Sequence, residues 1–347
     1  MSDILIRIED KAGRITLNRP QALNAMTYEM CLAIEAALED WRDDPDVALV
    51  VIDAAGDRAF CSGGDIQELY DTGRAGDFAY GQRFWADEYR LNAKIAEYPK
   101  PYIALMQGFT MGGGVGISCH GSHRIVGETS KIAMPECGIG LVPDVGGSWL
   151  LARAAGHLGA YLGLTATRMS AADAIYAGFA DTFVAERDWP ALISDLEMSG
   201  NPAIISDYAE AFAPGPLAAL TDRIDHFFLP GTLAGIVGLL ADDDSDFAQN
   251  TLKVMARNSP LSMACALEIL RRLQGDGDIR KALHLEYRFT ARAMEHGDFL
   301  EGIRAAIIDK DRAPKWRHKM DQVDPEEIAM MLAPLGDKGL NLKEQLK

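Results

Sequence analysis

Hydrophobic and polar positions alternate in short segments at the start of the chain. Isoleucines occupy every second position over residues 4–8, and a second apolar segment, residues 15–17, follows a turn at Gly13. A period of two is typical of strands, so these segments predict a β-hairpin. Thr27 is then a good helix cap, and apolar residues recur at helical spacing behind it. Those apolar residues are Met30, Ile34, Leu38 and Trp41.

Two continuous apolar runs predict further strands. Residues 47–52 and 102–106 are hydrophobic throughout, which is typical of strands covered on both faces. Each run is followed by a glycine cluster and then by a predicted helix, over residues 66–70 and 115–119. Strands that alternate with helices predict an α/β fold.

The strand pattern disappears beyond about residue 185. Ser259 and Pro260 are typical of a helix start, and a second helix is predicted over residues 278–296. The first of these helices has apolar side chains every four residues, at Leu261, Cys265, Ile269 and Leu273. We therefore predict an α/β core over residues 1–200 and a helical C-terminal region over residues 201–347.

Composition and charge narrow the classes of partner. The 347 residues are 48% hydrophobic and 24% charged, which is typical of a globular protein. With 34 basic and 51 acidic residues, the net charge is −17, which disfavours nucleic acid and anionic membranes as partners. An anionic ligand then needs a local positive site, such as free backbone N–H groups. A homo-oligomer is left open.

The cysteine pattern and the N-terminus predict a cytoplasmic protein. The five cysteines form no C-x-x-C pair, so we expect free thiols in a reducing compartment. The first residues lack the features of a signal or transit peptide, and no apolar run reaches the ~18–20 residues of a membrane span. No H-E-x-x-H or Cys/His cluster predicts a metal site.

Two glycine-rich segments are the first candidates for chemistry. They cover residues 59–66 and 108–116, and each lies between a predicted buried strand and a predicted helix. Free N–H groups at two helix starts can form an oxyanion hole. The alternative is that these are only tight packing turns. Neither segment fits a dinucleotide-binding or P-loop motif.

Glu136 and Asp144 are the second candidates. They lie eight residues apart, and the glycines and prolines around them exclude one continuous helix. A loop that folds back can bring the two side chains together, and paired carboxyls can divide acid and base roles. The alternative for each is a solvated or capping carboxylate. The apolar neighbours Ile139, Leu141, Val142 and Val145 favour burial.

Together these motifs resemble the crotonase (enoyl-CoA hydratase/isomerase) superfamily. Residues 18–20 and 23–26 are similar to its first-hairpin signature, and the two glycine segments to its oxyanion segments. The resemblance implies an α/β fold, a spiral of ββα turns, that binds coenzyme A thioesters. It also implies that the N–H groups of Gly64 and Gly113 hold the thioester oxygen, and that Asp65 braces its loop.

One departure from the superfamily pattern points to a subfamily. Hydratases carry a catalytic glutamate three residues after the second oxyanion glycine, where this chain has Gly116. The motif around Glu136 and Asp144 is similar to the 3-hydroxyisobutyryl-CoA hydrolase family, the thioesterases of valine degradation. That resemblance implies Glu136 and Asp144 as the catalytic pair, and Glu88 as a substrate contact. It implies no metal or redox cofactor, because coenzyme A enters as part of the substrate.

Two rival functions stay open at this stage. An enoyl-CoA isomerase or hydratase of the same superfamily could use Glu136, but Asp144 and the long C-terminal region disfavour it. A non-catalytic relative that binds CoA or RNA is the other rival. The net charge of −17 disfavours RNA, and two intact glycine segments disfavour the loss of chemistry.

Overall fold

The computed structural model describes residues 2–275 and 278–342, which divide into two compact units. Unit 1 contains the described residues up to Asp65, Arg90–Ala133 and Arg168–Ala219. Unit 2 contains Ile66–Tyr89, Met134–Thr167 and the described residues from Leu220 onward. Each unit therefore combines three separate stretches of chain, and the boundary expected near residue 200 stays a prediction.

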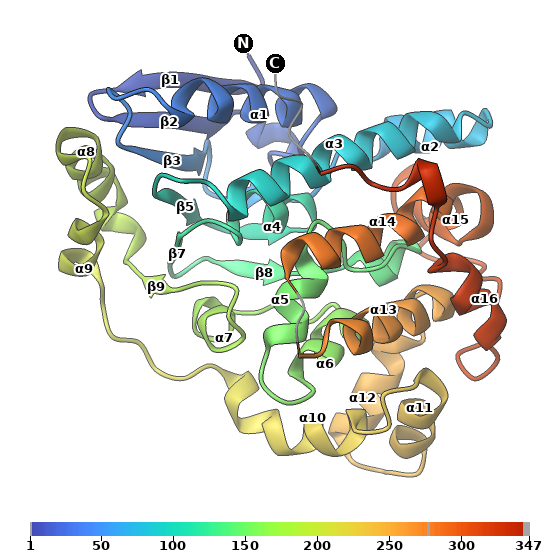
Figure 1. The fold of residues 1–347 in the computed structure, drawn as a ribbon. Coiled ribbons are helices and arrows are strands. Elements are labelled where there is room, and N and C mark those ends of the chain that lie inside the picture. The colour runs from blue at the N-terminus through green and yellow to red at the C-terminus, as the bar shows by residue number, and fades with distance from the viewer. Residues whose placement is uncertain (1, 276–277, 343–347) are drawn as a thin grey trace. The chain divides into compact units, whose positions relative to one another are not determined.

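Unit 1 is built on two β-sheets (Figure 1). The six-stranded sheet has the order β1 (Ile4–Glu9), β2 (Ala12–Leu17), β3 (Leu49–Ala54), β5 (Tyr102–Met106), β7 (His123–Val126) and β9 (Thr182–Phe183). The smaller sheet has the order β4 (Ala59–Cys61), β6 (Phe109–Met111) and β8 (Lys131–Ala133). β1 and β2 form the predicted antiparallel hairpin, although its turn lies at Asp10 and Lys11 and not at Gly13, which is paired inside β2. All the other neighbours are parallel. Both predicted buried strands are present, although β3 begins two residues later than the apolar run.

The start of the first helix of unit 1 follows a local capping signal. The helices of this unit are α1 (Tyr28–Arg42), α4 (Gly113–Ser118), α7 (Ala171–Tyr176), α8 (Trp189–Ser199) and α9 (Ile205–Tyr208). The Thr27 side chain accepts a hydrogen bond from the Met30 N–H at 3.2 Å, and all four predicted core residues of α1 are buried. α4 begins at Gly113, two residues before its predicted start, because Gly112 leaves β6 with a φ of +50°.

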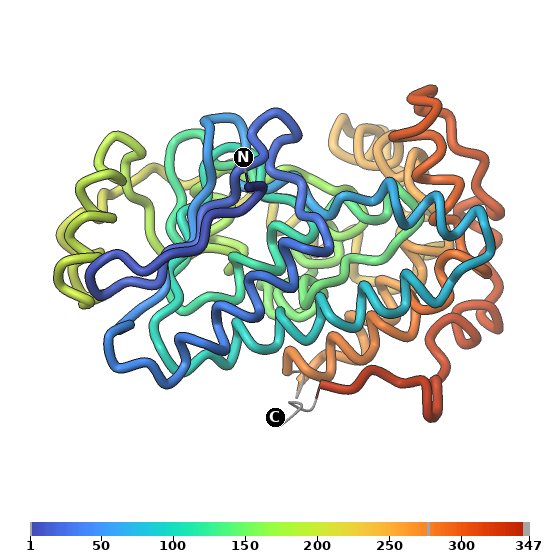
Figure 2. The backbone as a smooth tube through the Cα atoms, turned by 90° about the horizontal axis from the view of Figure 1, so that it is seen from above, coloured from blue at the N-terminus to red at the C-terminus, as the bar shows by residue number. Residues whose placement is uncertain are grey.

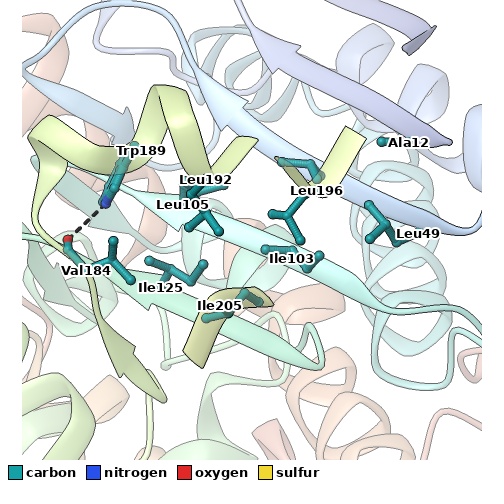
Figure 3. Close-up of a cluster of buried hydrophobic side chains, with 11 residues drawn as sticks. Ala12, Leu49, Ile103, Leu105, Ile125, Val184, Trp189, Leu192, Leu196 and Ile205 are labelled. Atoms are coloured by element: carbon teal, nitrogen blue, oxygen red, sulfur yellow. Dashed lines mark hydrogen bonds between the residues drawn. The ribbon is translucent and has the colours of Figure 1, made fainter. Parts of the chain in front are cut away.

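A hydrophobic core fixes α8 on the six-stranded sheet (Figure 3). Leu192 and Leu196 of α8 are fully buried among strand residues such as Leu105. The Trp189 indole N–H donates to the Val184 carbonyl at 2.9 Å, which anchors the start of the helix beside β9.

Unit 2 is helical. It contains α2 (Gln67–Arg74), the first part of α3 (Phe78–Ala96), α5 (Gly147–Arg153), α6 (Leu158–Thr165), α10 (Thr221–Phe228), α11 (Leu233–Ala241), α12 (Asp246–Met255), α13 (Pro260–Leu273), α14 (Ile279–His296), α15 (Phe299–Ile303) and α16 (Pro325–Met331). α13 contacts α5, α6, α14 and α16, and it lies beside α14 among the orange segments of Figure 2. Ser259 and Asp278 cap α13 and α14 as their side chains predict.

Within the described residues, no single helix has both the length and the apolar character needed to cross a membrane. The pair Pro216–Phe228 and Leu233–Ala241, bent by 111°, meets these criteria of length and composition only when the two helices are taken together.

The core of unit 1 generates a stability prediction. Leu192→Ala removes a fully buried side chain, so we expect the free energy of unfolding to fall by about 2–5 kcal/mol. Leu32→Ala is the matched control, because Leu32 is 39% exposed on α1 and should change stability by no more than about 0.5 kcal/mol. Urea unfolding measures both variants, and equal effects would contradict the assignment of this core.

Candidate functional site

The two glycine segments of unit 1 approach each other closely. β4 and β6 are parallel, Cys61 pairs with Thr110, and Gly64 and Gly113 lie three residues beyond these partners. A Cβ atom on Gly114 would lie 2.7 Å from the Cys61 carbonyl oxygen, which excludes any larger residue there. Gly63 has a φ of +112°, a conformation that favours glycine.

This arrangement leaves two backbone N–H groups free. The Met26 N–H donates to the Gly63 carbonyl at 2.9 Å, and the Asp65 N–H donates to the Met26 carbonyl at 2.8 Å. The Gly64 N–H between them has no acceptor in residues 2–275 or 278–342. Gly113 is the first residue of α4, and its N–H likewise has no acceptor in the described residues. Both groups can therefore donate to the oxygen of a ligand.

The hairpin signature braces the first glycine segment. The Arg19 guanidinium donates to Asp65 Oδ2 at 3.1 Å and to the Ala25 carbonyl at 2.7 Å. The Asn24 side-chain amide donates to the Ala59 carbonyl at 2.9 Å. Arg19 and Asn24 thus hold both ends of the loop that carries Gly64, and Asp65 has the bracing contacts that the resemblance implies.

Unit 2 contains a group of four buried acids, which we call the carboxylate cluster. It consists of Glu88 on α3, Glu136 in the 3-10 turn Glu136–Ile139, Asp144 before α5, and Glu286 on α14. None is more than 4% exposed, and none forms an ion pair with a basic side chain among the described residues. The prediction from the apolar neighbours that Glu136 and Asp144 are buried is therefore confirmed.

Burial is the largest influence on the pKa of each of these acids. It raises the pKa of Asp144 to about 7, although a hydrogen bond from Tyr89 acts in the opposite direction. Burial, followed by the charge of Asp144, raises the pKa of Glu136 and of Glu88 well above the ordinary value. The pKa of Glu286 rises to about 8. The four groups influence one another electrostatically, so Glu88, Glu136 and Asp144 lie in one cluster.

Hydrogen bonds distinguish the acids of the cluster. The Tyr89 hydroxyl donates to Asp144 Oδ2 at 2.7 Å. Glu286 accepts hydrogen bonds from the N–H groups of Gly146 and Ser148, at 2.9 and 3.1 Å, and from the Ser148 hydroxyl. Glu136 Oε2 is buried and has no hydrogen-bond partner among the described residues. Of these oxygens, Glu136 Oε2 is thus free to act on a ligand.

The structure therefore places the predicted residues in two sets. Gly64 and Gly113 belong to unit 1, whereas Glu88, Glu136 and Asp144 belong to unit 2, and their roles stay predictions. Sequence reasoning missed Glu286, which lies 140 residues beyond Gly146 and carries no local signal. Tyr89 could have been found, because it directly follows Glu88. No group of three or more His, Cys, Asp or Glu side chains in the described residues is arranged to hold a metal.

Comparisons with known proteins relate nearly the whole chain to one family. The family described as Enoyl-CoA hydratase/isomerase matches residues 12–332. The mitochondrial 3-hydroxyisobutyryl-CoA hydrolase of Xenopus tropicalis is 40% identical, over 95% of this chain and 89% of the relative. Its namesake in Homo sapiens is 36% identical, over 97% of this chain and 90% of the relative.

Two solved structures are also very similar. An enoyl-CoA hydratase from Rhodobacter sphaeroides is 59% identical with a TM-score of 0.94, covering 98% of this chain and 100% of that one. A carnitinyl-CoA dehydratase from Mycobacterium thermoresistibile is 38% identical, also with a TM-score of 0.94, covering 99% of this chain and 100% of that one.

The carboxylate cluster predicts a specific pH dependence of stability. The pKa of Asp144 is about 7 in the folded protein and 3.8 ordinarily, so the folded state binds this proton more tightly. Its contribution to stability is present below the ordinary pKa and is lost as the pH rises toward 7. Asp144→Asn cannot titrate. The free energy of unfolding of the wild type, minus that of the variant, should fall between about pH 4 and pH 7 in urea titrations. A difference that stays constant with pH would refute the buried, proton-binding Asp144.

Proposed function

This chain belongs to the enoyl-CoA hydratase/isomerase family, and on that premise we propose that it is an acyl-CoA thioester hydrolase. The membership confirms the resemblance stated from the motifs, and the solved relatives confirm the crotonase-like α/β fold with a helical C-terminal region. The curated relatives that cover nearly all of the chain are named 3-hydroxyisobutyryl-CoA hydrolases. We propose 3-hydroxyisobutyryl-CoA as the substrate, with free CoA and 3-hydroxyisobutyrate as the products.

One observation carries the proposal: Glu136 and Asp144 form a buried, interacting pair in a chain whose residue 116 is glycine. The hydratases that the motifs resemble hold one of their two catalytic glutamates at the position of Gly116. Gly116 lies inside α4 and has no side chain that could exchange a proton. The remaining pair of carboxyls suits hydrolysis, which needs a base or nucleophile for one step and a positioning or acid group for the other.

In the proposed reaction, a carbon–oxygen bond forms at the thioester carbonyl and the carbon–sulfur bond breaks. The N–H groups of Gly64 and Gly113 donate to the carbonyl oxygen as it gains negative charge, which is where such donors lower a barrier most. The thiolate of CoA leaves and takes up the proton that water has lost. Water therefore supplies both the oxygen of the acid and the proton of the thiol, and no metal or redox cofactor takes part in the proposal.

Glu136 and Asp144 are proposed to act on the water, the carbonyl carbon and the leaving thiolate. Glu136, through its free Oε2, either takes a proton from water or attacks the carbonyl to give a mixed anhydride that water then cleaves. Asp144, held by the Tyr89 hydroxyl, positions the substrate hydroxyl or the water, or assists departure of the thiolate. Both routes for Glu136 lead to the same products. Glu88 is proposed to contact the substrate.

Enoyl-CoA hydration is the second candidate function. The Rhodobacter sphaeroides protein, 59% identical to this chain, is described as an enoyl-CoA hydratase. A hydratase would have to add water to a double bond with Glu136 and Asp144 alone. An isomerase could use Glu136 by itself. Both rivals leave the thioester intact, so the release of free CoA separates them from the hydrolase.

The net charge and the cysteines of the chain bear on its partners and on its compartment. A small-molecule acyl-CoA substrate follows from the family, whereas nucleic acid and membranes are not proposed as partners because of the net charge of −17. The five cysteines are buried free thiols, which suits a reducing compartment. We propose the cytoplasm, although the curated relatives are named as mitochondrial proteins.

The substrate prediction is tested by comparing two acyl-CoA thioesters. Purified protein should release free thiol from 3-hydroxyisobutyryl-CoA, detected with a thiol reagent, and should act poorly on crotonyl-CoA, whose enoyl absorbance reports hydration. A protein-only blank corrects for the five cysteines. Rapid loss of the enoyl absorbance without thiol release would replace the hydrolase with a hydratase. Failure with both, combined with tight CoA binding, would favour the non-catalytic relative.

The catalytic prediction concerns Glu136. Glu136→Gln keeps the shape of the side chain but cannot accept a proton or attack, so kcat should fall at least ~10²-fold with little change in KM. In the wild type, kcat should rise with pH and then level off, because a base or nucleophile must be ionised. Since the pKa of Glu136 is raised well above 4.5, this rise should lie above the ordinary range of a glutamate. Turnover near the wild-type rate in the variant would assign the chemistry to another residue.

A further inference from the structure

The backbone directly after Asp144 adopts an uncommon conformation. Val145 has a φ of +53°, and Gly146 has a φ of +78°. Glycine adopts this left-handed region readily, but a β-branched residue such as valine does so at a cost of roughly 1–3 kcal/mol. Such a conformation persists only where the surroundings hold it in place. The loop between Asp144 and α5 must therefore be fixed by contacts from elsewhere in unit 2.

Glu286 makes those contacts. Its Oε2 accepts the Gly146 N–H at 2.9 Å, and its Oε1 accepts the Ser148 N–H at 3.1 Å as well as the Ser148 hydroxyl. Glu286 is fully buried. Both carboxylate oxygens are thus occupied by donors from the turn that follows Asp144.

The same face of α14 also reaches the donor to Asp144. Thr290 lies four residues after Glu286, one helical turn further on. The Tyr89 hydroxyl donates to Asp144 Oδ2 at 2.7 Å. It also makes a longer contact, 3.4 Å, in which Thr290 Oγ1 is the acceptor. α14 therefore supports Asp144 from two directions, through its loop and through Tyr89.

We propose that Glu286 is a positioning residue of the enzyme: it fixes the loop that carries Asp144 and, when it is ionised, its charge acts on the neighbouring carboxyls. The inference rests on the proposed function, because it gives Glu286 a task in the reaction of Glu136 and Asp144. It also gives the helical C-terminal region a direct part in the active site, through α14.

The charge of Glu286 faces acidic and polar groups from three other segments. These are Tyr89 from α3, Glu136 from its 3-10 turn, and Asp144 with Ser148 from the loop and the start of α5. Glu286 is ionised above its own pKa of about 8, and its charge is then among the causes that raise the pKa of Glu136. Replacing Glu286 by an uncharged side chain should therefore lower the pKa of Glu136, whereas a purely mechanical support would leave it unchanged.

The test compares Glu286→Gln with Glu295→Gln, which makes the same change at an exposed position of the same helix. A glutamine side chain has one acceptor oxygen and one N–H₂ group, so it cannot accept all three donors. We expect faster hydrogen exchange at the N–H groups of Gly146 and Ser148 in Glu286→Gln. We also expect kcat to fall about 10- to 100-fold, as for a misplaced catalytic group, and the rise of kcat with pH to move to lower pH. Glu295→Gln should match the wild type in every measurement.

Each outcome decides the inference. Unchanged exchange at Gly146 and Ser148, or unchanged kcat together with an unmoved pH profile, would overturn it. A folded Glu286→Gln protein that loses activity with an unmoved pH profile would reduce Glu286 to mechanical support and overturn the electrostatic half.

If the wild type shows no thiol release, the proposed function fails. The exchange measurement and an NMR titration of the Glu136 carboxyl, expected to shift to lower pH in Glu286→Gln, still test Glu286 by themselves. Ser148→Ala removes only one donor, so it should have a smaller effect than Glu286→Gln.

Discussion

The cost of removing carboxyl groups from water is the constraint on which unit 2 depends. Glu88, Glu136, Asp144 and Glu286 are all buried, and no basic side chain in the described part of the chain forms an ion pair with them. Burial without a counter-ion favours the protonated form and raises each pKa. Backbone N–H groups and hydroxyls are the partners that compensate for lost hydration. Carboxyls that hold protons near neutral pH are well suited to acid and base chemistry.

In unit 2, backbone N–H groups are bonded to a buried carboxylate, whereas in unit 1 two backbone N–H groups are available to the oxygen of a ligand. A chain with a net charge of −17 offers an anionic oxygen two backbone N–H donors, at Gly64 and Gly113, that have no acceptor among the described residues. The close approach of the two segments depends on the absence of a side chain at Gly114. The Arg19–Asp65 ion pair braces the first segment. The charge of Arg19 therefore holds the backbone of this segment in place. Fixed dipoles of this kind need no reorganisation when charge develops on a bound oxygen.

The similar proteins are named after two different reactions, hydrolysis of a thioester and hydration of an enoyl-CoA. Relatives described as hydrolases and as hydratases share this fold, at 40% and 59% identity respectively. Identity over the whole chain mainly reflects the shared scaffold, whereas the reaction depends on which protons can move at a few positions. The absence of a carboxyl at Gly116 and the presence of Asp144 therefore weigh more in the proposed function than the difference in identity.

The sequence by itself determined the local structure and part of the site. Hydrophobic periods, capping residues and glycines predicted the β1–β2 hairpin, α1, α13 and α14, because these signals act between near neighbours. They also singled out Glu136 and Asp144, although not what surrounds them. Only the tertiary structure decided that Glu286, 140 residues beyond Gly146, holds the loop after Asp144. A hydrogen bond between distant segments depends on which helices pack together, and the choice of partner leaves no periodic trace in either sequence.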